Sequence, residues 1–247
     1  MLLAVVIPAY NERELLPRLI ERLDATPPPM GPGGPVERRI VLVDDGSKDG
    51  TGDIVRELGK REDVTAIVHE RNTGKGGALR TGFKAAMAFG ADVVIVQDAD
   101  LEYDPSDHAL VLAPILDGRA DAVIGSRFIG HTHRVLYYRH YQANRFLTMV
   151  SNMLTNLNLS DIECCFKAFS RPVLERLEIR EKRFGVEPET VAKLAKMRLP
   201  REGGVRALRI YEVAVSYAGR TYAEGKKITW RDGVSALRCI VRYNLFR

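Results

Sequence analysis

Cysteine is scarce in this sequence: the 247 residues include only Cys164, Cys165 and Cys239. Two of the three are adjacent, and no C-x-x-C pair occurs, so the usual spacings of a zinc site and of a dithiol redox centre are both missing. An odd number of cysteines arranged in this way fits a reducing compartment best. We therefore expect a cytoplasmic protein.

Long hydrophobic runs are also lacking. No stretch of about 18 apolar residues is present, which is the length that a membrane-spanning helix needs. No signal segment precedes the first apolar stretch, LLAVVIP. We therefore expect that the chain does not span a bilayer and that any membrane contact is peripheral.

Low-complexity segments and internal repeats are absent as well. With 45% hydrophobic residues, the chain is long enough for one large domain over residues 1–247 with a core of its own. Its 37 Lys and Arg outnumber its 32 Asp and Glu, which gives a net charge of +5. This balance favours anionic partners such as nucleotides, phosphates or acidic membrane surfaces, without choosing among them.

Short apolar stretches alternate with segments of helical spacing through the first half of the chain. We expect strands at 2–8, 39–46, 64–70, 91–100 and 122–128, and helices at 12–23, 51–61, 76–90 and 106–118. Continuously apolar strands are typical of a parallel sheet that helices cover on both faces. The predicted fold is therefore α/β, with a mostly parallel open sheet and functional loops at the carboxyl ends of its strands.

The second half differs in character. Residues 135–161 mix aromatic, basic and aliphatic side chains at helical spacing and carry no acid before Asp161. Such a segment could lie on a membrane surface or form a core-packed pair of amphipathic helices. We further expect a surface loop at 26–37, helices at 165–177, 188–197 and 232–246, and a strand at 207–218.

Carboxylates follow the apolar stretch VVIVQ, at Asp98, Asp100 and Glu102. Acids at a strand-to-loop edge are able to hold a hard divalent cation, Mg²⁺ or Mn²⁺, that also binds diphosphate oxygens. A lone D-x-D is common by chance, because loop acids are usually solvated. The interpretation therefore depends on the clusters around it.

Two further polar clusters end the first two predicted strands, and their position suits the binding of a nucleoside. We favour a binding role for Tyr10, Glu12, Asp44 and Asp45. Asn11 and Asp49 are good helix caps, and we expect them to cap helices instead. After the third strand, residues 72–77 (NTGKGG) offer backbone N–H groups and Lys75 to a phosphate, although they lack the spacing of a Walker motif.

Four clusters, VIPAYNE, VDDGSKDGT, NTGKGGALRTG and DADLE, occur in this order. Together they resemble family-two glycosyltransferases of GT-A fold, in particular the dolichyl- and polyprenyl-phosphate mannose and glucose synthases. GSRF, LTNLNLSDIECCFKAF, RFGVEPE and GRTYAEGKK extend the resemblance over nearly the whole chain. It implies an inverting, metal-dependent transfer of a hexose from a UDP- or GDP-sugar to polyprenyl or dolichyl phosphate, at the cytoplasmic face of a membrane.

The resemblance also implies roles for individual residues. Residues 1–128 would form the nucleotide-sugar half, and 129–247 the acceptor half with membrane-surface helices. The nucleotide-sugar residues would be Pro8, Ala9, Tyr10, Glu12, Asp44, Asp45, Lys75, Asp98, Ala99, Arg220 and Lys226. The metal ligands would be Asp98, Asp100 and Glu102, the acceptor-side residues Arg127, Asp161 and Glu187, and the catalytic residues Asp100, Asp161 and Arg127.

Several alternatives remain open from the residues alone. Asp161 and Glu187 could cap a helix or pair with a neighbouring arginine, and Arg220 with Lys226 could form a solvated basic turn. A phosphate acceptor needs no general base, whereas a hydroxyl acceptor would need one, for which Asp161 is the candidate. A soluble saccharide acceptor, a sugar nucleotidyltransferase and a basic nucleic-acid-binding module are the competing functions. The last of these leaves the D-x-D cluster unexplained, and we expect no nucleic-acid partner.

Overall fold

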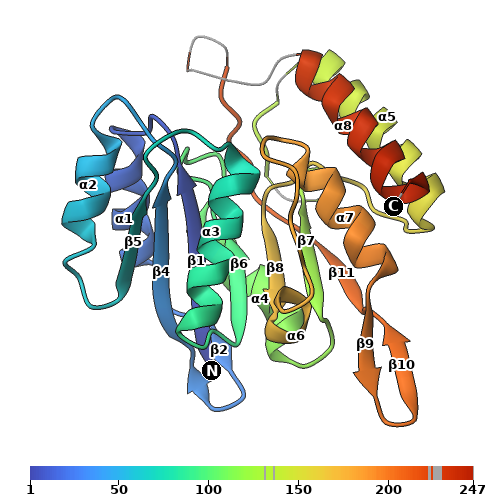
Figure 1. The fold of residues 1–247 in the computed structure, drawn as a ribbon, viewed down its shortest axis with the longest axis horizontal. Coiled ribbons are helices and arrows are strands. Elements are labelled where there is room, and N and C mark those ends of the chain that lie inside the picture. Colours follow the sequence, from blue (N-terminus) through green and yellow to red (C-terminus); the bar gives the residue numbers. More distant parts are fainter. Residues whose placement is uncertain (131, 136, 222–223, 225–229, 247) are drawn as a thin grey trace.

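A seven-stranded sheet forms the centre of the computed structural model, which describes residues 1–130, 132–135, 137–221, 224 and 230–246 (Figure 1). Its strand order is β11-β7-β8-β6-β1-β4-β5. The strands are β1 (Leu2–Ala9), β4 (Glu37–Asp44), β5 (Val64–Val68), β6 (Val93–Val96), β7 (Ala122–Ser126), β8 (Lys167–Ser170) and β11 (Ile210–Ala214). All run parallel except β8, which lies antiparallel between β6 and β7. The predicted mostly parallel α/β sheet is confirmed.

Helices cover both faces of this sheet (Figure 1). One face carries α1 (Leu15–Ala25), α2 (Thr51–Leu58) and α4 (His108–Leu116), which follows the short 3-10 helix η1 (Pro105–Asp107). The other face carries α3 (Lys75–Ala88), α5 (Tyr138–Thr155), α6 (Arg171–Leu174), α7 (Val186–Lys196) and α8 (Trp230–Leu245).

The two faces explain why the strands are apolar throughout. Along β1, Val5 and Ile7 belong to one hydrophobic core, whereas Ala4 and Val6 belong to the other. Successive side chains of a strand point to opposite faces, so a strand with helices on both sides needs an apolar residue at every position. The strands are therefore fixed between two apolar cores, and polar residues follow at their carboxyl ends, where the candidate site lies.

The prediction of a helix over 165–177 is wrong. Residues Lys167–Ser170 form β8, and only Arg171–Leu174 are helical. Phe166 and Ala168 pack into one core while Phe169 packs into the other, which is a strand pattern two residues in period. Pairing with both β6 and β7 therefore overrode the apparent helical spacing.

Two short hairpins form in regions where the sequence predicted no strand. The expected surface loop at 26–37 contains β2 (Met30–Gly31) and β3 (Gly34–Pro35). Residues 198–207, for which no element was predicted, form β9 (Arg198–Arg201) and β10 (Gly204–Ala207). Their turn uses Gly203 and Gly204 at φ values of 73° and 150°, which other residues rarely adopt.

Within the segment 135–161, residues Tyr138–Thr155 form one long helix, α5, where a pair of helices was one of the two expectations. It ends at Asn156 in the left-handed conformation, with φ 56°. Helix α8 lies beside α5 at the edge of the molecule, and both contact α7 (Figure 1). Within the described ranges, no helix is both long and apolar enough to cross a bilayer.

Candidate active site

The residue groups predicted from the sequence meet at the carboxyl ends of the parallel strands. Asp44 ends β4, Asp98 follows β6, and Arg127 follows β7. These three strands run in the same direction within one sheet, with β1 between β4 and β6 and β8 between β6 and β7, so their carboxyl ends share one edge of the sheet. The fold therefore gathers acidic and basic side chains that are far apart in the sequence, such as Asp100 and Arg220, which are 120 positions apart.

Lys75 links the first acid of the D-x-D to the second half of the chain. Its Nζ lies 2.8 Å from Oδ1 and 2.9 Å from Oδ2 of Asp98, and 3.2 Å from Oε1 of Glu187. Glu187 also forms an ion pair with Lys167, a buried lysine of β8. The first turn of α7 thus supplies a carboxylate that two lysines share.

Arg220 holds the remaining acids together. Its Nη2 lies 2.9 Å from Oδ2 of Asp100, its backbone N–H donates to Oε1 of Glu102 at 2.9 Å, and its Nη1 lies 3.7 Å from Oε2 of Glu12. Tyr217 Oη donates to the other oxygen of Glu102 at 3.0 Å. The residues implied for the metal and for the diphosphate are therefore in direct contact.

Negative charge is in excess around Asp100. Burial, together with the charges of Asp98 and Glu102, raises the pKa of Asp100 to about 7, although Arg220 acts in the opposite direction. A cation placed among these carboxylates would relieve that repulsion. In the part of the chain that the structure describes, no three Asp, Glu, His or Cys side chains are already arranged to hold an ion, and Lys75 and Arg220 bind the acids instead.

The paired acids that end β4 have different environments. Asp45 is fully engaged: its Oδ1 accepts from Thr73 N at 2.9 Å and lies 2.8 Å from His69 Nδ1, and its Oδ2 accepts from Gly74 N at 2.7 Å. Asp44 Oδ2 accepts from Ser47 N at 3.2 Å, whereas its buried Oδ1 has no hydrogen-bond partner among the described residues. Asp45 therefore positions the glycine-rich loop, whereas one carboxylate oxygen of Asp44 accepts no hydrogen bond from the described residues.

The glycine-rich loop at the start of α3 is packed against residues 181–183. Gly76 N donates to Lys182 O at 2.9 Å, and a Cβ on Gly74, whose φ is 82°, would lie 2.1 Å from the same carbonyl oxygen. The N–H groups of Gly74 and Gly76 are thus already used within the chain. Phosphate binding by this loop and by Lys75 stays a prediction.

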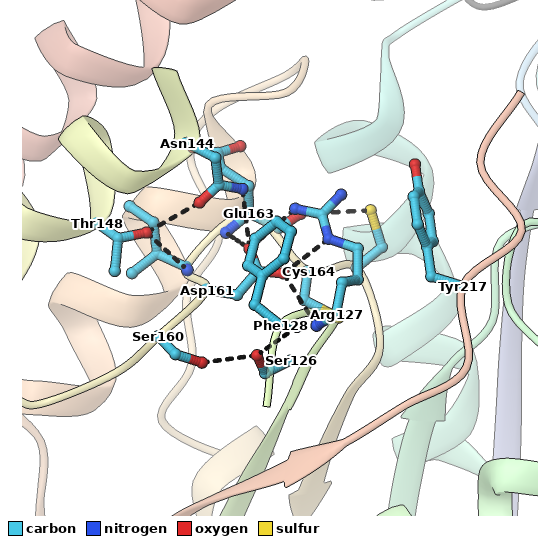
Figure 2. A network of polar contacts seen from close by, with 12 residues as sticks. Ser126, Arg127, Phe128, Asn144, Thr148, Ser160, Asp161, Glu163, Cys164 and Tyr217 are labelled. Carbon is cyan, nitrogen blue, oxygen red and sulfur yellow. Dashed lines mark hydrogen bonds and ion pairs between the residues drawn. The ribbon is translucent and has the colours of Figure 1, made fainter. Parts of the chain in front are cut away.

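A buried ion pair forms the acceptor-side candidate (Figure 2). Arg127 Nε lies 2.6 Å from Oδ2 of Asp161 and Nη2 lies 2.8 Å from Oδ1, while Asn144 of α5 donates to Oδ1 at 2.9 Å. Burial opposes ionisation of Asp161, but the charge and hydrogen bonds of Arg127 outweigh it and hold the pKa of Asp161 below its usual range. Of the alternatives for Asp161, the structure shows the pairing with arginine.

Tyr217 connects the two clusters, and sequence reasoning missed it. Its ring lies under the Arg127 guanidinium, 5.1 Å from centroid to Cζ, while its hydroxyl bonds to Glu102. Its place in VSYAGR, three residues before Arg220, was the available signal. The path from Asp161 through Arg127 and Tyr217 to Glu102 joins the acceptor-side pair to the acids.

Glu163 and Lys167 were also missed. Glu163 Oε1 is buried without a hydrogen-bond partner among the described residues. Burial and the charge of Glu187 raise the pKa of Glu163 to about 7. Glu163 and Lys167 occur in DIECCFK, which the resemblance covers, but residue type alone does not show that both side chains turn inward.

The remaining predicted residues fall as follows. Pro8 and Ala9 end β1, Tyr10 follows them, and Ala99 is buried between the two aspartates. Asn11 does not cap α1, which begins at Leu15; its Oδ1 accepts from Lys48 N at 2.9 Å, so that prediction is wrong. Asp49 Oδ1 accepts from the N–H of Thr51, the first residue of α2, at 3.0 Å. Lys226 lies outside the described residues.

Comparisons with known proteins place the chain in a family. The model described as "Glycosyl transferase family 2" matches residues 4–178. A UDP-N-acetylglucosamine–dolichyl-phosphate N-acetylglucosaminyltransferase of Methanococcus voltae is 30% identical, over 93% of this chain and 94% of the relative. The chain therefore belongs to glycosyl transferase family 2 and is a glycosyltransferase.

Two other proteins are informative. A polyprenol monophosphomannose synthase of Mycolicibacterium smegmatis is 33% identical, over 71% of this chain and 64% of the relative. The glucosyl-3-phosphoglycerate synthase of Mycobacterium tuberculosis, crystallised with Mn²⁺, uridine diphosphate and phosphoglyceric acid, superposes with a TM-score of 0.69 and 18% identity, over 99% of this chain and 79% of that one. The second likeness confirms the GT-A fold.

Proposed function

We propose that this glycosyltransferase moves a hexose from a UDP- or GDP-sugar to polyprenyl or dolichyl phosphate, with inversion, at the cytoplasmic surface of a membrane. The proposal rests on two clusters that are in contact with each other. In one, Arg220 binds Asp100 and Glu102; in the other, Arg127 pairs with Asp161. Tyr217 contacts both clusters, through Glu102 and through the Arg127 guanidinium. The names of the relatives, which include transferases to dolichyl and polyprenyl phosphates, support the acceptor.

Asp98, Asp100 and Glu102 fit a divalent cation. Carboxylate oxygens are the hard donors that Mg²⁺ and Mn²⁺ prefer, and the pKa of Asp100 is raised by burial and by the neighbouring charges of Asp98 and Glu102, both of which a bound cation would offset. When bound, Mg²⁺ or Mn²⁺ would neutralise charge on the diphosphate. The Mn²⁺ of the mycobacterial structure supports this part of the proposal.

Asp44 would bind the donor base. Its buried Oδ1 lacks a partner among the described residues and is an acceptor for an N–H group. Uracil and guanine both offer such a group, so this contact serves either donor. Arg220, held beside the acids, would face the diphosphate and stabilise the charge that leaves with it.

The acceptor side would need no general base. In the proposed displacement, an ionised phosphate oxygen of the acceptor forms the new bond to the anomeric carbon. The bond from that carbon to the diphosphate breaks, and its electron pair leaves with the nucleotide. Arg127 would attract the acceptor phosphate, and Asp161 would orient the guanidinium through its two contacts. Asp161 as a base for a hydroxyl acceptor remains the alternative.

The proposal can be tested by incubating the purified protein with UDP- and GDP-hexoses and Mn²⁺, with and without polyprenyl phosphate, and by measuring the products. The expected result is lipid-linked sugar and free nucleoside diphosphate with one donor, both lost on chelation and restored by Mn²⁺. Sugar transfer to a soluble hydroxyl, with polyprenyl phosphate inert, would overturn the acceptor. Release of pyrophosphate would instead identify a nucleotidyltransferase.

A further inference from the structure

Lys75 pairs with two carboxylates that come from different parts of the fold. Its Nζ contacts both carboxylate oxygens of Asp98, which follows β6, and lies 3.2 Å from Oε1 of Glu187 in the first turn of α7. Only 12% of the Lys75 side chain and 6% of the Glu187 side chain are exposed. An ammonium group with so little access to water needs a carboxylate beside it, so Lys75 depends on these two acids.

Glu187 is held in place independently of Lys75. Its Oε2 pairs with Nζ of Lys167, a buried residue of β8 that also donates to the backbone carbonyl oxygens of Ile162 and Cys164. Lys75 approaches the other carboxylate oxygen, Oε1. One lysine therefore fixes Glu187, and the second oxygen remains for Lys75.

The starts of α3 and α7 are in backbone contact, which limits the distance between Lys75 and Glu187. Gly76 N donates to Lys182 O at 2.9 Å, and a Cβ on Gly76 would lie 2.0 Å from Glu181 O. Both carbonyl groups belong to the segment that leads into α7. Because glycine has no side chain, the two segments approach closely, and Lys75 stays within reach of Glu187.

Lys75 occupies the oxygens of Asp98 that a divalent cation would need. Asp98 is one of the acids that fit such a cation, and Nζ lies within 2.9 Å of both its oxygens. A cation at Asp98 and the ammonium group of Lys75 would repel each other. Lys75 would then need another carboxylate, and Glu187 is already beside it.

We infer that Glu187 is a positioning residue of the donor side, which holds Lys75 when Asp98 binds a divalent cation. The inference deepens the proposed function and rests on its metal site. It assigns Glu187 to the donor side, although the resemblance implied the acceptor side. Within the described ranges, Glu187 forms no ion pair or side-chain hydrogen bond with Arg127 or Asp161, which pair with each other.

Titration of the full chain with Mn²⁺, followed by electron paramagnetic resonance, tests the inference without turnover. Glu187→Gln should bind Mn²⁺ about tenfold more weakly, because Asp98 becomes the one carboxylate left to Lys75; tenfold corresponds to about 1.4 kcal/mol. The matched control is Glu189→Gln, which removes a buried carboxylate from the same turn of α7 that pairs with Lys193 instead. It should leave the affinity for Mn²⁺ unchanged. Equal losses in both variants would overturn the inference.

A double-mutant cycle separates an effect through Lys75 from a direct effect of charge. Lys75→Met removes the competing ammonium group and should raise the affinity for Mn²⁺. In this background, Glu187→Gln should change the affinity less than about threefold, and the difference from its effect in the unaltered protein measures the coupling. A loss of about tenfold in both backgrounds would show that Glu187 acts without Lys75, and the inference would fail.

The stability of the variants requires its own comparison, because Glu187→Gln also removes the partner of buried Lys167. Glu187→Gln with Lys167→Met removes both charges of this pair and should recover much of the free energy of unfolding, measured in urea. Its affinity for Mn²⁺ should remain about tenfold below that of the unaltered protein. Recovery of the affinity together with the stability would show that Glu187 has a structural role alone, against the inference.

Transfer kinetics distinguish failure of the inference from failure of the proposed function. Glu187→Gln should raise the KM for the nucleotide-sugar and leave the KM for the acceptor unchanged. An effect confined to the acceptor KM would return Glu187 to the acceptor side and overturn the inference. Mn²⁺ binding that depends on Glu187 through Lys75, without any sugar transfer, would support the inference and refute the proposed function. Absence of Mn²⁺ binding to the unaltered protein would refute the metal site and the inference together.

Discussion

Arg220 Nη2 lies 2.9 Å from Oδ2 of Asp100, which joins two residues 120 positions apart in the chain. The same arginine binds Glu102 through its backbone N–H and approaches Glu12. One cation from the segment after β11 thus neutralises acids that follow β1 and β6. A metal ion at these acids and the Arg220 guanidinium would therefore compete for the same oxygens.

Arg220→Gln should bind Mn²⁺ more tightly but turn over more slowly. Loss of the guanidinium frees Asp100 and Glu102, and a gain of about 1.4 kcal/mol corresponds to a tenfold rise in affinity. Turnover should fall about 10²–10³-fold, since the leaving diphosphate loses a stabilising charge. Titration followed by electron paramagnetic resonance measures the first effect, and nucleotide release the second. Arg209→Gln, which alters a contact to Asp121 far from these acids, is the control and should change neither.

Asp44→Asn and Asp45→Asn should separate binding from stability. Asp44→Asn replaces a carboxylate at an oxygen that has no partner in the described structure, so we expect nucleotide affinity to fall about tenfold or more with little loss of stability. Asp45→Asn disrupts bonds to Thr73, Gly74 and His69 and should lower the free energy of unfolding by about 1–3 kcal/mol. Nucleotide titration and urea denaturation measure the two quantities. The reverse pattern would contradict our assignment of the pair.

Asp161→Asn should destabilise the protein strongly. It removes the charge that compensates buried Arg127, and breaking a buried ion pair costs about 3–5 kcal/mol. Asp121→Asn is the comparison, because the arginines that it pairs with are more exposed, and its cost should be smaller. The double variant Asp161→Leu with Arg127→Met should recover much of the stability without recovering transfer. Recovery of transfer would show that Arg127 does not act on the acceptor.

Glu163→Gln should change how stability depends on pH. The folded protein raises the pKa of Glu163 from 4.5 to about 7, so this side chain stabilises the fold when protonated. Its contribution is present below about pH 4.5 and is lost as the pH rises to 7. At about 1.4 kcal/mol per pKa unit, the partly exposed side chain should account for about 1–3 kcal/mol. Urea denaturation from pH 4.5 to 8 should show that the variant's advantage grows across this window; a constant difference would refute it.

The donor-side half of the fold was predictable because its signals are local. A strand covered on both faces must be apolar throughout, as β1 and β6 are, and parallel strands bring their carboxyl ends to one edge. Asp44 and Asp98 were therefore expected at the same edge of the sheet, and β1 alone separates the strands that they follow or end. The D-x-D was predicted at the end of a strand, and β6 ends two residues before Asp98.

The rest depended on contacts between distant segments. Nothing local to Phe166–Ser170 shows that β8 would enter the sheet between two earlier strands, so its four residues were predicted as helix. Likewise, the sequence around Asp45 and Lys75 does not show that both side chains are occupied by other parts of the chain. Such pairings follow from tertiary packing, which overrides local preference.

The position of β8 also limits how the enzyme can change. Because β8 lies hydrogen-bonded between β6 and β7, the strands that carry Asp98 and Arg127 are held two strand spacings apart, about 10 Å. This separation is part of a rigid ladder and does not depend on a hinge. Relatives with the same arrangement of β6, β8 and β7 would therefore adapt to other sugars or lipids through side chains and loops at this edge of the sheet, while the distance between the two proposed substrate sites stays constant.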